Sequence, residues 1–251
     1  TIDKKALFEK TITDLLHGLD PHSNYIAAED LVAMSENIQG KFGGVGIRFT
    51  IYDDTLSVVN VIDRSPAYRV GIQKFDQIIN VDGEAIANVG LSNEHVRELL
   101  KGEEGTPVKV TILRNGEQIQ KEIIRGAVPI ESISASYMLT NEIGYIRLSQ
   151  FSMQSANEFY AAAIGLQSQG MKKLVFDLRY NGGGVLGSAV SILDAILEAG
   201  TPIVSTKGKN SPERVIYSEN APFLGDVDIA VLINSSSASA SEIVAGALQD
   251  N

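Results

Sequence analysis

The sequence of 251 residues contains no cysteine, so disulfide bonds, thiolate chemistry and a cysteine-based zinc site are excluded. It also lacks any apolar run close to the ~20 residues that are needed to span a bilayer. Long basic blocks are absent too, and the net charge of −10 argues against nucleic-acid binding. We expect neither a cofactor nor a metal. The 44% of hydrophobic residues is enough for real cores, in two modest domains or one large one.

A signal peptide is missing as well, because Thr1 leads directly into the polar residues Asp3, Lys4 and Lys5. We therefore expect the sequence to be an internal fragment of a longer protein whose targeting segment is not included. The lack of cysteine fits an exported protein.

The most informative stretch lies near the end of the chain. Residues 228–234 form a short apolar run typical of a buried strand, and residues 243–248 repeat apolar side chains at helical spacing. The serines between them therefore lie on a tight turn at a helix start, where N–H groups lack partners and negative charge is favoured. Such a turn can present a nucleophile and hold an oxyanion. The plain alternative is a capping box made by Ser239 and Glu242.

A second strand end favours the chemical interpretation. Residues 174–179 predict another buried strand, and Gly182, Gly183 and Gly184 follow at its carboxyl end. Consecutive glycines expose backbone N–H groups and allow conformations that a side chain forbids. Hydroxyls at one strand end and bare amides at another are the two halves of a serine hydrolase centre.

The strings DLRYNGGG at 177–184 and NSSSASASEIVAGAL at 234–248 resemble the carboxyl-terminal processing peptidases, which are serine peptidases with a Ser–Lys dyad. The resemblance implies that Ser239 is the nucleophile. It also implies that the backbone amides of Gly184 and Ala240 form the oxyanion hole.

Four other residues of these strings receive no catalytic role. Asp177 and Arg179 match the strand motif of the family and are interpreted as structural. Ser237 and Ser241 flank the predicted nucleophile as small polar residues.

We predict three regions and an α/β (α+β) fold class. Residues 1–38 form an N-terminal helical segment, residues 39–126 a PDZ-like peptide-binding domain, and residues 127–251 a serine peptidase core that is incomplete at its carboxyl end. Strands and helices alternate in this last region, which is typical of an α/β core. The resemblance implies a crotonase-like or ClpP-like spiral of β-β-α units, with the PDZ domain inserted.

The N-terminal region is expected to hold a helix that ends at Gly18 and a second one over 29–38. Between them, the Asp20–Pro21 pair predicts a turn, and LDPHSNY at 19–25 resembles the segment before the sensor domain of the family. His22 is interpreted as a turn residue, because no second histidine stands at metal-binding spacing.

The PDZ-like region is predicted from short strands, an Asn115–Gly116 hairpin and one helix over 91–101. PDZ domains bind a peptide's free carboxylate on backbone N–H groups and add its strand beside a helix. The groove is expected between residues 45–49 and that helix. The predicted carboxylate loop comprises Gly43, Gly44, Val45, Gly46 and Ile47.

Two positions depart from the family pattern. The chain has Lys74, Phe75 and Asp76 where the family usually carries Pro-Gly before the aspartate, so this turn must be built differently. Lys101 stands where family members often place arginine; it keeps the charge but loses bidentate geometry.

The general base is not found in the sequence. His17, His22 and His95 all lie in the first two regions, far in sequence from Ser239, and the 12 residues after Ser239 contain no lysine. The resemblance implies a lysine further along the chain, so we expect the fragment itself to be inactive.

We therefore predict a serine-type endopeptidase that recognises substrate C-termini through its PDZ domain. The alternative is a catalytically decayed PDZ scaffold; an isomerase or hydratase of crotonase type has little support. Protein or peptide substrates with free C-termini are the expected partners, and a homo-oligomer or a regulatory partner is left open. The family implies an extracytoplasmic location, periplasmic or membrane-associated. Residues 206–224, with Lys207 and Lys209, are predicted to be a solvated loop.

Overall fold

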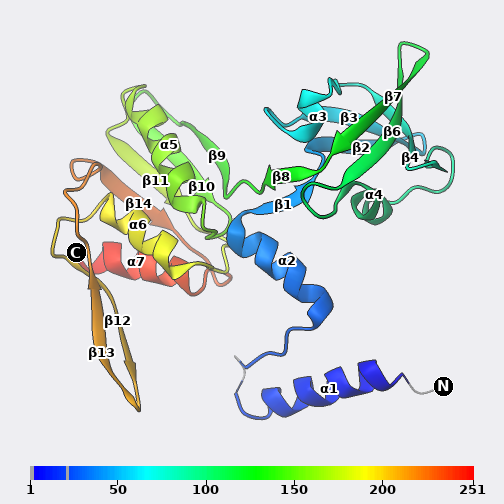
Figure 1. The fold of residues 1–251 in the computed structure, drawn as a ribbon. Helices are drawn as coiled ribbons and strands as arrows, with labels where there is room; N and C mark the ends of the chain where they lie inside the picture. The colour runs from blue at the N-terminus through cyan, green and yellow to red at the C-terminus, as the bar shows by residue number, and fades with distance from the viewer. Residues whose placement is uncertain (1–2, 21–22) are drawn as a thin grey trace. The chain divides into compact units, whose positions relative to one another are not determined.

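The computed structural model describes residues 3–20 and 23–251 (Figure 1). The chain divides into two compact units, of which one comprises residues 40–131 and the other residues 1–39 together with 132–251. The predicted turn at Pro21 and His22 lies outside the described residues. Among the described helices, none has the length and apolar character that crossing a membrane requires.

Two helices precede the inserted unit. Helix α1 (Lys4–His17) begins at Asp3, whose carboxylate accepts the N–H groups of Lys5 and Ala6, and it ends at Gly18 as predicted. Helix α2 (Ala28–Gln39) confirms the second predicted helix. No residue of α1 is buried. Its apolar residues Leu7, Phe8 and Leu15 are exposed.

The unit of residues 40–131 is built on an antiparallel sheet whose strand order is β2-β3-β4-β6-β7, with β5 beside β4. A separate ladder pairs β1 with β8, so that the two ends of the unit run side by side. The strands are β1 (Lys41–Gly44), β2 (Ile47–Tyr52), β3 (Thr55–Val61), β4 (Gln77–Val81), β5 (Glu84–Ala85), β6 (Pro107–Arg114), β7 (Glu117–Ile124) and β8 (Gly126–Pro129); the helices are α3 (Pro66–Arg69) and α4 (Asn93–Leu100).

Local sequence explains the shape of this unit. Asn115 and Gly116 both have positive φ, 53° and 85°, which matches the two-residue hairpin turn predicted between β6 and β7. Alternate residues of β6 point inward, so Val108, Val110 and Ile112 are buried in the core.

The second unit contains a four-stranded sheet with the order β14-β11-β10-β9. Strands β10, β11 and β14 are parallel, and β9 is antiparallel to β10. The predicted α/β class with an inserted domain is thereby confirmed. The strands are β9 (Ile133–Met138), β10 (Ile143–Leu148), β11 (Lys173–Asp177) and β14 (Asp228–Leu232); the helices are α5 (Ser155–Gln167), α6 (Leu186–Asp194) and α7 (Ala240–Asp250).

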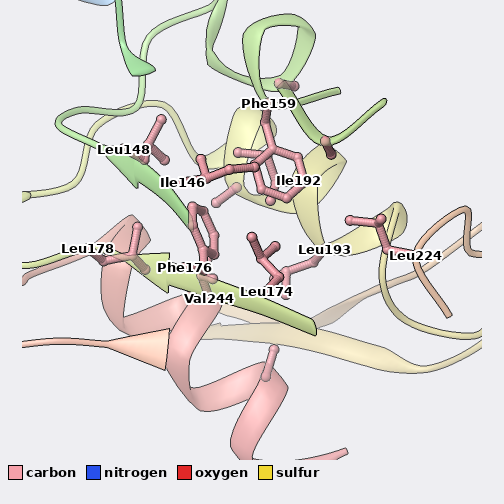
Figure 2. Packing of buried hydrophobic residues seen from close by; sticks show 14 of the residues in the cluster. Ile146, Leu148, Phe159, Leu174, Phe176, Leu178, Ile192, Leu193, Leu224 and Val244 are labelled. Atoms are coloured by element: carbon pink, nitrogen blue, oxygen red, sulfur yellow. The ribbon is translucent and has the colours of Figure 1, made fainter. Parts of the chain in front are cut away.

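The core of this unit lies where the sheet meets its three helices (Figure 2). Ile146 and Phe176 come from neighbouring strands, whereas Phe159, Ile192 and Val244 come from α5, α6 and α7. Because parallel strands end at the same edge of a sheet, the segments that follow β11 and β14 emerge together. This edge carries the candidate site.

One prediction for this unit was wrong. Residues 206–224 are not a loop throughout, because β12 (Pro202–Gly208) and β13 (Ser211–Tyr217) pair as an antiparallel hairpin. The charged residues around the turn hid the short β-branched pairs at 203–204 and 215–216. Helix α6 ends at Asp194, whose carboxylate accepts the N–H groups of Glu219 and Asn220.

Candidate active site

The glycine run and the serine turn meet at the edge formed by the ends of β11 and β14. Asp177 lies opposite Leu232 in the parallel ladder, so both segments leave the sheet at the same level. A Cβ placed on Gly183 would lie 2.7 Å from the Cβ of Ser239 and 3.0 Å from the amide nitrogen of Ala240. The structure therefore brings together the two halves that the sequence predicted.

Ser239 adopts an unusual backbone conformation for the residue that caps a helix. Its φ is 54° and its ψ is −115°, whereas Ser65 and Ser92 cap their helices with φ of −68° and −108° and extended ψ. The capping box with Glu242 is present, with the carboxylate accepting the Ser239 N–H at 2.7 Å. A cap does not need this strain, which is characteristic of functional turns. The side chain of Ser239 is exposed.

Two amides beside this turn are unbonded. Within residues 3–20 and 23–251, no hydrogen bond is donated by the N–H of Gly184 or of Ala240. The neighbouring amide of Gly183 is used differently, because it donates to Oδ1 of Asn181 at 2.9 Å. Gly184 and Ala240 therefore keep their donors available for an anion.

Gly184 is held in a conformation that only glycine adopts readily. Its φ is 140°, and a Cβ at this position would overlap the carbonyl oxygen of Phe151.

Several polar side chains join the two segments, and the sequence analysis gave them no role in the site. The buried hydroxyl of Ser241 donates to the carbonyl oxygen of Asn181 at 2.8 Å, and the Ala238 N–H donates to the same oxygen at 3.1 Å. The Ser237 hydroxyl donates to Leu178 O at 2.8 Å. These two hydroxyls bind the backbone of the glycine-run segment and neither is bonded to Ser239, which agrees with the absence of a catalytic role. In the sequence, only their position within the motif string of residues 234–248 pointed to them.

The buried carboxylate of Asp177 forms an ion pair with the half-exposed side chain of Arg179 at the end of β11. The Asp177 side chain is fully buried, and Arg179 donates to both its oxygens, with Nη2 2.7 Å from Oδ2. The hydroxyl of Tyr145 donates to the same carboxylate at 2.6 Å. Burial alone would raise the pKa of Asp177, but these hydrogen bonds outweigh it and lower the pKa to about 2. The pair supports the structural interpretation of both residues.

In the other unit, the predicted carboxylate loop also presents unbonded amides. Neither Val45 nor Gly46 donates its N–H in a hydrogen bond within the described residues. Their carbonyl groups are occupied: Val45 O accepts the Ala67 N–H, and Gly46 O accepts the Ile62 N–H and the Ser65 hydroxyl. The carbonyl groups of these two residues therefore hold the loop in place through hydrogen bonds, while their amides are available to a ligand.

The remaining predicted loop residues lie on the strands that flank it. Gly43 and Gly44 end β1, and a side chain on Gly43 would overlap the carbonyl oxygen of Gly102. Ile47 begins β2 and, with Phe49, is partly buried against the core of the unit. Leu99 on α4 packs on the same core, so both β2 and α4 carry partly buried apolar residues. The groove between them stays a prediction.

The two departures from the family pattern have local explanations. Phe75 takes a φ of 74°, a value for which glycine is suited, and its ring is exposed beneath the Lys74 ammonium. Asp76 is buried and accepts two hydrogen bonds from Arg114. The Lys101 ammonium lies 4.5 Å from the centre of the Phe42 ring.

The described histidines do not supply a base. His95 Nε2 lies 3.0 Å from Oε1 of Glu84 within the unit of residues 40–131. His17 is the exposed last residue of α1, and His22 lies outside the described residues. No hydrogen bond joins a histidine to Ser239 in the described part of the chain.

The fold is an α/β unit whose sheet edge carries a strained serine beside two unbonded amides, and a PDZ-like unit of residues 40–131 is inserted into it. Comparisons with known proteins agree with both assignments. Residues 142–251 match the model of peptidase family S41, and residues 43–124 match that of the PDZ domain. The predicted resemblance to the carboxyl-terminal processing peptidases is thereby confirmed.

Individual relatives cover nearly the whole chain. A carboxy-terminal-processing protease of Bartonella bacilliformis is 39% identical over 99% of this chain and 58% of its own length. A probable CtpA-like serine protease of Staphylococcus aureus is 32% identical over 99% of this chain and 50% of its own length. The solved photosystem II D1 C-terminal processing protease aligns with a TM-score of 0.49 at 27% identity, over 100% of this chain and 69% of that one. The chain thus spans about half the length of the curated relatives it matches, from 46% to 58%.

Proposed function

We propose that this chain is part of a serine endopeptidase that binds substrate C-termini at its PDZ domain and cleaves peptide bonds with Ser239. The observation that carries the proposal is the strained, exposed Ser239 between two unbonded amides, those of Gly184 and Ala240. The family supports the same reaction.

In the proposed reaction, the Ser239 hydroxyl attacks the carbonyl carbon of the scissile peptide bond and gives up its proton to a general base. The negative charge that develops on the carbonyl oxygen is stabilised by the N–H groups of Gly184 and Ala240. Collapse of the tetrahedral intermediate expels the amine, which takes a proton from the base. Water then releases the acyl group by the reverse sequence.

We propose that the base is a lysine in a segment beyond Asn251 of a longer form of the protein. A desolvated lysine can be neutral near pH 7 and then accept a proton. The chain itself offers no lysine after Ser239. We therefore propose that the 251 residues alone are inactive.

The test compares the chain with a form extended to the length of its relatives, on an unstructured protein substrate. We expect turnover only from the extended form, and its loss on Ser239→Ala. Turnover by the 251-residue chain that Ser239→Ala abolishes would contradict the lysine assignment. An extended form that is folded, binds peptides and never cleaves would point to the decayed scaffold.

We also propose that the loop from Gly43 to Ile47 binds a peptide's terminal carboxylate, supported by the unbonded amides of Val45 and Gly46. Titration of the 251-residue chain with matched free-acid and amidated peptides that end in an apolar residue tests this. We expect binding of the free acid only. Equal affinities would remove carboxylate recognition from this loop.

The regional division and the location are further proposals. We propose a helical segment over 1–38, the peptide-binding region over 39–126 and the peptidase region over 127–251. We also propose an extracytoplasmic location, supported by the family. A fusion of the longer protein's N-terminal segment to a reporter that is active only outside the cytoplasm tests the location, and an inactive, stably expressed fusion would contradict it.

A further inference from the structure

The segment of residues 149–153, which connects β10 to α5, holds the backbone around Gly184. The Phe151 N–H donates to Gly183 O at 3.0 Å, and Phe151 O accepts the Val185 N–H at 2.8 Å. Phe151 and Gly184 thus form a single parallel bridge. Because the peptide groups on both sides of Gly184 bond to one residue, the direction of the Gly184 N–H depends on where Phe151 lies.

A cluster of three buried hydroxyls holds this segment in place. Ser152, Ser155 and Ser132 are each fully buried. The Ser132 and Ser152 hydroxyls lie 3.0 Å apart, and the Ser155 hydroxyl lies 2.7 Å from that of Ser132 and 3.2 Å from that of Ser152. The Ser155 hydroxyl also accepts the Ser152 N–H at 2.7 Å. Each hydroxyl in this cluster therefore depends on the other two.

The same segment is bonded to both stretches of chain that flank the inserted unit. The Ser149 N–H donates to Ser132 O at 2.8 Å, just after that unit ends, and the Met153 N–H donates to Ile38 O at 2.8 Å, just before it begins. The carboxylate of Glu158 accepts the Ser132 N–H at 2.7 Å.

This arrangement is costly to disturb, since a buried polar network is stable only when every member is satisfied. Removing one hydroxyl leaves its two neighbours short of a partner and lets the segment shift. Stabilisation of an oxyanion depends on amides held in place before the reaction, so a small shift of the Gly184 N–H lowers the rate.

We propose that residues 149–153 are a support that positions the Gly184 amide for catalysis, with Ser152 as a positioning residue. The proposal rests on the proposed peptidase function of Ser239 and Gly184. It assigns to Ser152 no contact with substrate, so its effect falls on the rate of the chemical step and not on substrate binding.

The test measures kcat and KM of the extended protein with Ser152→Ala. We expect kcat to fall about tenfold, a fraction of the ~10²–10³ that losing one oxyanion donor costs, while KM stays within about twofold. The matched control is Ser218→Ala. Ser218 is also buried, and its hydroxyl donates to Asp194 and to Leu197 O in the same unit. It should lower the melting temperature similarly and leave kcat unchanged.

Ser239→Ala separates this inference from the proposed function. If Ser239→Ala abolishes activity and Ser152→Ala behaves like Ser218→Ala, the positioning role of residues 149–153 is overturned, whereas the assignment of Ser239 as the nucleophile is kept. If Ser239→Ala remains active, the proposed function itself fails.

Amide hydrogen exchange in the 251-residue chain gives a second readout that needs no base. We expect the Val185 amide to exchange about tenfold faster in Ser152→Ala, because its acceptor Phe151 O is no longer held, and to be unchanged in Ser218→Ala. Should Ser152→Ala fail to fold, Ser152→Cys keeps the volume with a weaker donor and is measured in its place. An unchanged Val185 amide in the folded variant overturns the proposal.

Discussion

Ser65 and Ser239 occupy equivalent places in the two units, since each caps a helix and each lies against a glycine. A Cβ on Gly46 would overlap the Cβ of Ser65, and one on Gly183 would lie 2.7 Å from the Cβ of Ser239. Both glycines have positive φ, 82° and 99°. The two units therefore use the same local device, a glycine that lets another segment approach a helix start.

The two serines differ in how the device is used. Ser65 is buried, has extended backbone angles, donates its hydroxyl to Gly46 O and accepts the Tyr68 N–H. Ser239 is exposed and has strained angles. A serine that only stabilises a turn satisfies its hydroxyl and relaxes its backbone. A serine that reacts must leave its hydroxyl accessible, and the fold bears the strain of presenting it.

The largest effect is expected when each of these two serines is replaced by glycine. Ser239→Gly should lower kcat of the extended protein by about 10⁶-fold, because the nucleophile is gone. In the 251-residue chain the same change should raise the free energy of unfolding by about 1 kcal/mol, since glycine tolerates a φ of 54°. Ser65→Gly should instead lower it by about 1 kcal/mol or more, through a lost buried hydrogen bond. Urea denaturation measures both, and a destabilised Ser239→Gly would show that the serine is only a cap.

Substitutions in the two glycine loops should impair different properties, catalysis in one unit and peptide binding in the other. Gly184→Val should lower kcat by ~10²–10³-fold and leave peptide binding intact, because its side chain would overlap Phe151 O and displace the amide. Gly46→Val should abolish binding of free-acid peptides through its overlap with Ser65. Ala240→Gly keeps its N–H and should be mild. A folded Gly184→Val enzyme with near-normal kcat would make the glycine run a purely structural turn.

A substitution at Asp177 tests whether its buried carboxylate stabilises the fold. Its pKa is about 2 in the folded chain against an ordinary value of 3.8, so its charged form stabilises the fold at pH values above about 4. As the pH falls towards 2 the carboxylate is protonated and this contribution is lost. Asp177→Asn should therefore cost about 2 kcal/mol at pH 7 and progressively less between pH 4 and pH 2. Denaturation curves at both ends check this, and a cost independent of pH would contradict it.

The smallest effect is expected at Phe75, whose positive φ has no proposed role in catalysis or binding. Phe75 adopts a φ of 74° with its ring exposed, so Phe75→Gly should raise the free energy of unfolding by up to about 1 kcal/mol. Phe75→Ala keeps the strained Cβ and should bring no gain. Peptide binding should be unaffected by either variant. An equal gain from alanine would attribute the effect to the exposed ring and not to the backbone.

Much of the local structure could be predicted from the sequence. The Asn115–Gly116 hairpin, the strands before Gly182 and before Ser239, and the helix end at Gly18 all follow from residues close together in the chain. The burial predicted for the strand before Ser239 was wrong, because β14 lies at the edge of its sheet and none of its residues is buried. The hairpin of β12 and β13 was missed because its charged turn residues dominate a short β-branched pattern. The support around Phe151 carried no local signal, since Ser132, which completes the hydroxyl cluster with Ser152 and Ser155, lies about twenty residues away in the chain.

By itself, the sequence determined the α/β class and the two strand ends that carry the site, because glycine runs, turn residues and apolar strands have local signatures. The resemblance of its motif strings to the carboxyl-terminal processing peptidases implied the inserted PDZ domain and the candidate residues Ser239, Gly184 and Ala240. Only the tertiary structure decided which amides remain unbonded and which serine is strained. These properties depend on Phe151, which reaches the glycine run from another segment, and on bonds between the two strand ends such as that from the Ala238 N–H to Asn181 O. A hydrogen bond between distant residues forms only after folding has brought them together, and no pattern along the chain specifies it.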